Sequence, residues 1–437
     1  NMPALGGTNI NLALLDAISL RNPTEDSSGG RPLVLLFLTD GLPTEGVTEI
    51  SQILANTRHN STSYLRLFAF GVGDDVNTEL LDSLASENGG LVNYVRPNER
   101  IDEEVSSLYA RIQSPVLSEL ELNFGNVGVE EIYPPSLPDL FSGTQLLVAG
   151  RYRLETGQTG RTEISLTGMV NGEKQVYRKR VDFSANSGAV GTYSFIPRLW
   201  AARKIGYLLN QIRYQGENSE WVDAVIKLSL RYGVITHYTS FLVQEEDIFS
   251  EEGWQDAAEE LARDYSGPAV GADAVEKAES ESNLRSAESV PEPIFSSEPH
   301  SNYTADPVLK YVDDKSFFLQ SGIWIDSQYD PEEMDVVKIS FGSEVYFDLL
   351  TARPALGKIL ALGNQVIFVI NDSAYEIIPG EEGVKSVPQE LIEQEATLQS
   401  KMEKKDGDYQ VRRSFCSAPF LTGLIWLGWR WSKDSHI

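Results

Sequence analysis

The sequence predicts an α/β fold for residues 1–113, in the form of a doubly wound parallel sheet. A continuous apolar run over residues 33–39 ends in Thr39-Asp40-Gly41, which is typical of a strand buried on both faces. Strand-like runs of this kind alternate with segments of helical periodicity, the pattern of parallel sheets with helical crossovers. Gly89-Gly90 then closes one of the helical segments, as helix C-caps do.

The elements of this first segment follow from its periodicity. Leu12, Leu15 and Ile18 recur on one helical face, and the other helical segments repeat that spacing. We expect helices over 9–19, 49–60, 77–88 and 99–113, and strands over 33–39, 65–71 and 91–95.

A second segment, residues 114–244, has a different pattern. Short runs of alternating apolar and polar residues are separated by turn residues, which predicts a small antiparallel β-module. An apolar helical stripe follows from Phe195, with Pro197 suited to the first turn, and residues 221–232 form a second helical pattern. We therefore expect a β-rich module followed by a helical pair.

The rest of the chain, residues 245–437, begins with an acidic stretch. Residues 245–306 contain 17 acidic and 3 basic residues, a net −14 out of −28 for the chain, and little apolar periodicity. This composition predicts a disordered acidic linker, with a short helix within 251–265 as an alternative for that part. Residues 307–380 then predict a small α+β module, whose first hairpin turns at Ser321-Gly322.

The C-terminal segment, residues 381–437, combines a charged helical piece ending near Lys405 with an apolar stretch over 418–429. That stretch is too short to span a bilayer. It fits an interfacial anchor, an aberrant terminus or an ill-ordered tail, and we favour the last, which leaves membrane association open.

Composition excludes several function classes for this chain of 437 residues, of which 41% are hydrophobic. The negative net charge argues against nucleic acid and anionic membrane surfaces as partners. The single cysteine, Cys416, allows no internal disulfide, and the four histidines lack metal-ligand spacing. Nucleophile-elbow, Walker A and dinucleotide-binding motifs are also absent from the sequence. We therefore predict that the protein is not an enzyme.

Two residues, Thr8 and Asp40, are candidate metal ligands. Gly6-Gly7-Thr8-Asn9 opens a helix, and Asp40 follows a strand at the edge where open α/β sheets bind ligands. A hydroxyl and a carboxylate are hard oxygen donors that suit Mg²⁺. Taken singly, Asp40-Gly41 is a turn signal and Thr8 a possible helix cap. Their combination in this order favours a metal site.

Residues 1 to about 112 resemble the last two-thirds of a von Willebrand factor type A domain. Gly7-Thr8-Asn9 and Thr39-Asp40-Gly41 match the second and third parts of the family's metal-ion-dependent adhesion site, and the segment 68–73 matches the next strand. The first part of that site, Asp-x-Ser-x-Ser, does not occur in the sequence. The resemblance therefore implies an N-terminally truncated type A domain.

A second resemblance extends to about residue 247. Residues 195–209 and 228–240 are similar to the region that follows the type A domain in inter-alpha-trypsin inhibitor heavy chains, and more so to bacterial relatives that carry a VIT domain. This resemblance implies an adhesion or protein-interaction module. It favours an exported, periplasmic or cell-surface location.

The type A resemblance also implies how the module binds. In that family a metal ion leaves one coordination position open, which a Glu or Asp of the protein partner fills. Thr8 and Asp40 are the ligands that carry over to this sequence, with Mg²⁺ expected in the full-length protein. Two protein oxygens alone hold Mg²⁺ poorly. The alternative is a regulatory subunit of the chelatase or AAA+-associated class, against which the heavy-chain-like segment argues.

Overall fold

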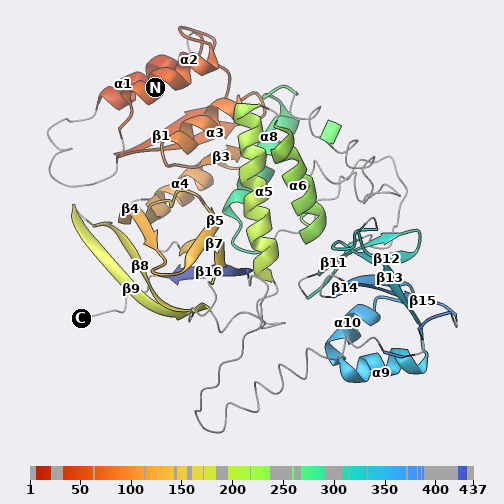
Figure 1. The fold of residues 1–437 in the computed structure, drawn as a ribbon. Coiled ribbons are helices and arrows are strands. Elements are labelled where there is room, and N and C mark those ends of the chain that lie inside the picture. Colours follow the sequence, from red (N-terminus) through yellow and green to blue (C-terminus); the bar gives the residue numbers. More distant parts are fainter. Residues whose placement is uncertain are drawn as a thin grey trace.

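The computed structural model of the chain contains a parallel sheet, an antiparallel β-module, a helical pair and a C-terminal α+β unit (Figure 1). The residues that the structure describes are 6–20, 33–62, 64–112, 115–141, 145–154, 160–170, 172–183, 195–216, 218–236, 258–259, 267–290, 309–313, 315–331, 333–370, 373–380, 382–384, 386–387 and 422–430.

The N-terminal segment forms the predicted α/β structure. Its three strands are parallel and lie in the order β1 (Leu33–Thr39), β2 (Leu65–Val72) and β3 (Val92–Val95). Helices alternate with these strands along the chain: α1 (Ile10–Ser19), α2 (Ile50–Asn60), α3 (Thr78–Glu87) and α4 (Ile101–Ile112). The predicted fold class is thus confirmed for this segment.

Both faces of this sheet are covered, as a doubly wound sheet requires. Leu67 and Ala69 of β2 pack in one core cluster with residues of α1, α2 and α3. Phe68 and Phe70 point to the opposite face and pack with Leu108 of α4. Alternate β2 residues therefore serve two cores, which explains why the strand is continuously apolar.

The expectation that residues 33–39 are buried on both faces is wrong. Most residues of β1 are only partly buried, and Leu38 is 44% exposed, whereas β2 is almost wholly buried. The reason is position in the sheet. Within the part of the chain that the structure describes, β1 pairs with a strand on one side only, so it is less covered than the central strand β2.

The second segment folds into two antiparallel sheets. One has the order β6-β4-β8-β9 and the other β16-β7-β5, in which β16 (Thr422–Arg430) comes from the C-terminal part of the chain. Leu117, Val148 and Leu166 pack between them in one apolar cluster. The strands are β4 (Pro115–Asn123), β5 (Gly128–Tyr133), β6 (Leu140–Phe141), β7 (Gln145–Arg153), β8 (Arg161–Val170) and β9 (Glu173–Asp182).

The helical pair consists of α5 (Phe195–Gln215) and α6 (Ser219–Tyr232). Asn218 caps the start of α6 through its side chain, and Gly233 ends it in the left-handed conformation, with φ of 63°. The pair packs against the β-module through Trp200 of α5 and Tyr133 of β5.

The structure differs from the expected disordered linker over residues 267–290, and most of the rest of 245–306 lies outside the described residues. Residues 272–286 form a helix, α8 (Ala272–Ser286), whose Val275 and Ala278 lie in the core of the parallel sheet and whose Leu284 lies in the core of the helical pair. Composition gave no sign of this, because the docking depends on buried polar groups as well as on apolar residues. The short helix considered for 251–265 falls almost entirely outside the described residues.

The C-terminal unit is a mixed six-stranded sheet in the order β10-β11-β12-β14-β15-β13, covered by helices. Leu309 and Phe318 of this sheet join the core of the helical pair, so the unit is packed against α5 and α6. Its elements are β10 (Leu309–Val312), β11 (Lys315–Gln320), β12 (Ile323–Asp326), β13 (Val336–Ser340), α9 (Glu344–Ala352), a 3-10 turn (Pro354–Leu356), α10 (Gly357–Leu360), β14 (Val366–Ile370) and β15 (Ser373–Ile378).

The apolar tail also differs from expectation. Instead of an ill-ordered segment, residues 422–430 form β16 (Thr422–Arg430), which pairs with β7 in antiparallel register from Thr422–Arg153 to Arg430–Gln145. The charged helix expected to end near Lys405 lies outside the described residues. Among the helices described, none has the length and apolar character needed to cross a membrane.

Candidate metal-ion site at the carboxyl edge of the parallel sheet

Thr8 lies in the loop before α1 and does not cap that helix. The cap is Asn9, whose side-chain Oδ1 accepts a hydrogen bond of 3.0 Å from the main-chain N–H of Leu12. The interpretation of Thr8 as a simple helix cap is therefore wrong, because the neighbouring residue fills that role.

The Thr8 loop is tied to the loop between β1 and α2. The main-chain N–H of Thr8 donates to Oγ1 of Thr44 at 2.7 Å, and the carbonyl of Thr8 accepts from the N–H groups of Thr44 and Glu45 at 2.9 and 3.3 Å. The N–H of Gly7 donates to Oε1 of Glu45 at 3.1 Å. A β-carbon at Gly7 would lie 2.6 Å from the side chains of Thr44 and Glu45, so this close approach requires glycine.

Asp40 follows directly after β1, at the carboxyl end of the strand, and is exposed. The preceding residue shapes the turn: Oγ1 of Thr39 donates to the carbonyl of Gly41 at 3.0 Å and accepts from its N–H at 3.4 Å. Asp40 thus begins the same loop that holds Thr8 through Thr44. The structure brings the two predicted ligand-bearing loops together at one edge of the sheet.

This edge offers hard oxygen donors that match Mg²⁺ in kind but not in number. Thr8 supplies a hydroxyl and Asp40 a carboxylate, whereas Mg²⁺ requires six oxygens in near-octahedral geometry. Glu45 already accepts a hydrogen bond from Gly7. Among the described residues there is no cluster of three or more His, Cys, Asp or Glu side chains able to hold a metal ion. A Mg²⁺ ion at this edge would need further oxygens from water or a partner.

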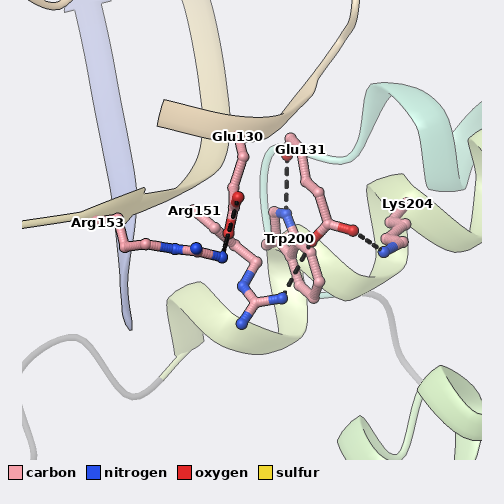
Figure 2. A network of polar contacts seen from close by, with 6 residues as sticks. All are labelled: Glu130, Glu131, Arg151, Arg153, Trp200 and Lys204. Atoms are coloured by element: carbon pink, nitrogen blue, oxygen red, sulfur yellow. Dashed lines mark hydrogen bonds and ion pairs between the residues drawn. The ribbon is translucent and has the colours of Figure 1, made fainter. Parts of the chain in front are cut away.

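A second polar network joins the β-module to α5 (Figure 2). The indole N–H of Trp200 donates to the carbonyl of Glu131 at 3.0 Å. The Glu131 carboxylate accepts hydrogen bonds from Lys204 and from Arg151, the latter at 3.3 Å. The Arg151 and Lys204 cations also lie 5.7 and 5.1 Å from the Trp200 ring centre. The network fixes α5 on the sheet through one buried aromatic residue.

The same contacts control the charge of Glu131. Partial burial acts to raise the pKa of this carboxyl, but the hydrogen bonds and positive charges of Lys204 and Arg151 outweigh it and lower the pKa below its ordinary value. Glu131 and its two cationic neighbours thus form a structural ion pair. Glu131 does not have the raised pKa of a general acid.

Sequence reasoning missed these contacts and a buried pair between Arg213 and Asp82. Nη2 of Arg213 in α5 donates to Oδ2 of Asp82 in α3 at 2.5 Å, across 131 positions of sequence. No motif or spacing signals a contact of such separation. Asp82 is 2% exposed, but its helical neighbours at three and four positions are Thr78, Glu79, Ala85 and Ser86, so the sequence marks no apolar face there.

Comparison with known proteins supports the assignment of the N-terminal segment. Residues 1–107 match the model of the von Willebrand factor type A domain. The chain is therefore similar to a type A domain over this segment. Its similarity extends beyond that domain to inter-alpha-trypsin inhibitor heavy chains: it is 32% identical to human heavy chain H6 over 273 residues and 30% identical to human heavy chain H4 over 260 residues.

These matches cover 57% and 56% of the chain, but only 20% and 27% of the two human relatives. The chain thus spans about a fifth to a quarter of the length of these relatives. Among solved structures, a von Willebrand factor type A protein from Catenulispora acidiphila aligns with 59% of this chain and 70% of its own, at 16% identity and a TM-score of 0.35. The ArnB paralog VWA2 from Sulfolobus acidocaldarius aligns with 61% and 70%, at 13% identity and a TM-score of 0.29.

Proposed function

We propose that this chain is a protein-interaction module that binds an acidic side chain of its partner through Mg²⁺ at the carboxyl edge of the parallel sheet. The observation that carries the proposal is the pairing of the Thr8 loop with the loop that begins at Asp40, through Thr44. That pairing supports the proposal because the two joined loops carry a hydroxyl and a carboxylate and lie at the edge where open α/β sheets bind ligands. We propose further that the chain binds its partner without catalysing a reaction.

The match to the type A domain model and the similarity to heavy chains support an interaction role. Similarity beyond the type A domain favours this role over a chelatase-type regulatory subunit. We extend the proposal to an exported or cell-surface location, the one expected for the heavy-chain-like class. With two protein oxygens, metal binding by the chain alone should be weak and should strengthen when a carboxylate fills a further position.

Mn²⁺, a paramagnetic substitute for Mg²⁺, tests the site. Mn²⁺ should broaden the amide NMR signals of residues 7–9 and 40–45 first, and Asp40→Asn should remove this selectivity. Asp16→Asn, which removes a carboxylate from the neighbouring helix α1, is the matched control. Line broadening that is unchanged in Asp40→Asn, or that is strongest at another acidic surface, would place the metal elsewhere and contradict the proposal.

A further inference from the structure

Residues 267–290 run as a strap from the carboxyl edge of the parallel sheet to α5 of the helical pair. At its start, the N–H of Gly271 donates to the carbonyl of Asp74 at 3.0 Å, and the carbonyl of Ala269 accepts from the N–H and Oγ1 of Thr78 at 3.0 and 3.2 Å. These contacts hold the loop between β2 and α3. At its end, Nε of Arg203 in α5 donates to the carbonyl of Ala287 at 2.9 Å.

The helix within this strap, α8, has little apolar surface with which to dock. Its buried apolar side chains are two alanines and two larger residues, Val275 and Leu284. An isolated helix of this length is marginal in water. The helix is therefore expected to be stable only while it is docked.

Charge supplies much of the docking instead. Nη2 of Arg213 lies 2.5 Å from Oδ2 of Asp82 and 3.1 Å from Oε2 of Glu281, whose side chains are 2% and 1% exposed. Arg213 thus joins α3, α5 and α8 at one point. A second pair, Arg96 and Glu279 at 2.5 Å, lies at the partly exposed rim.

Of the three charged residues at this point, Glu281 is the one that belongs to the strap, so its ion pair with Arg213 latches the strap onto α5. With the strap away, Arg213 keeps Asp82 as its partner, since both belong to elements outside the strap. With the strap docked, Glu281 is buried and forms an ion pair with Arg213, which compensates its charge. Loss of the Glu281 charge should therefore weaken the docking of α8 and leave the Arg213–Asp82 pair in place.

We propose that residues 267–290 form a releasable strap, latched by Glu281 on Arg213, whose opening frees the loop of residues 73–78 at the carboxyl edge of the parallel sheet. The loop is bound to the strap by three hydrogen bonds, so release of the strap removes them together. The strap is thus a conformational device that couples this edge to the helical pair. The inference does not depend on a bound metal.

Hydrogen exchange of the full chain, read by mass spectrometry in EDTA, tests the strap. Amides of α8 and of residues 73–78 should exchange together and faster than those of β2 and β15, as in sub-global opening. Glu281→Gln should speed exchange in both segments by about tenfold or more, because it removes one charge of a buried ion pair. The matched control Glu276→Gln, on the exposed face of α8, should change these rates by less than about twofold.

Three results would overturn the proposal. The first is exchange of α8 at the rate of β2, which would make it an integral part of the core. The second is faster exchange of α8 in Glu281→Gln without a change at residues 73–78, which would remove the coupling. The third is an equal rise in every element, β15 included, which would show that Glu281 supports the whole fold.

Discussion

The N–H of Thr8 donates a hydrogen bond of 2.7 Å to Oγ1 of Thr44, and this contact joins the two loops that carry the candidate metal ligands. The carbonyl of Thr8 accepts a hydrogen bond from the N–H of Thr44, so Thr8 and Thr44 are linked in both directions. Such a reciprocal pair fixes the main chain on either side and leaves the Thr8 hydroxyl outside the pairing.

Replacement of Thr44 by valine should loosen the edge without disturbing the core. The change removes the acceptor for the Thr8 N–H and keeps the shape of the side chain. Because Thr44 is exposed, the expected loss is about 0.5–1 kcal/mol in the free energy of unfolding, measured by urea denaturation. Thr48→Val, another exposed threonine of the same loop, should cost less. An equal effect from both would show that the Thr8–Thr44 bond contributes nothing measurable.

Replacement of the helix cap Asn9 should reduce the stability of the fold more than replacement of either candidate ligand. Asn9→Ala removes the cap of α1 and should cost about 1 kcal/mol. Thr8→Ala and Asp40→Ala should each change stability by less than about 0.5 kcal/mol, because neither leaves a core cavity. Thermal unfolding of the three variants checks the order, and a larger loss for Thr8→Ala than for Asn9→Ala would contradict it.

Tyr311 should make the protein sensitive to alkaline pH. Burial raises the pKa of Tyr311 to about 12, although Arg198 acts to lower it, and its hydroxyl donates to the carbonyl of Gly233 at 2.5 Å. An unfolded tyrosine has a pKa of about 10. The unfolded state therefore loses its proton first, so this stabilisation is complete below about pH 10 and declines as the pH rises towards 12.

Tyr311→Phe removes that proton equilibrium together with the hydrogen bond. The variant should be less stable than the parent at pH 8, and the difference should narrow between pH 10 and 12. Denaturant unfolding across this pH range measures the effect, with the exposed Tyr109→Phe as control. A difference that stays constant with pH would mean that Tyr311 titrates as it does in the unfolded chain.

The strand β16 should protect β7 from solvent exchange. Removal of residues 422–437 deletes the nine-residue strand and leaves the edge of β7 unpaired, which should speed amide exchange over residues 145–153 and promote aggregation. Removal of residues 431–437 alone keeps the strand and serves as control. Unchanged exchange in the longer deletion would show that β16 does not pair with β7 in solution.

Local signals in the sequence predicted the parallel sheet well. The alternation of strand-like and helical periodicity and the Thr39-Asp40-Gly41 turn depend on residues that are neighbours in the sequence. Both can therefore be recognised from the sequence alone. The exposure of Leu38 was missed, because a continuous apolar run does not reveal whether its strand lies at the centre or the edge of a sheet. For the site, the placement of Thr8 beside the Asp40 loop was inferred from topology alone.

The contacts that sequence reasoning missed depend on tertiary structure. Composition predicts disorder for the stretch around α8, yet Glu281 is buried there because Arg213, 68 positions away by their numbers, compensates its charge. Likewise, the alternation of β16 is interrupted by glycines, and its strand state depends on pairing with β7. Neither interaction leaves a local pattern.

The most direct test of the central claim is Mg²⁺-dependent capture of an acidic peptide. A bead library of peptides with one central Glu, and a matched library with Gln, would be exposed to the labelled chain in Mg²⁺ or in EDTA. We expect selective retention on Glu beads in Mg²⁺, lost in EDTA and in Asp40→Asn, and kept in Asp16→Asn. Equal retention on Glu and Gln beads, or retention that survives Asp40→Asn, would contradict a metal-bridged interaction at this edge.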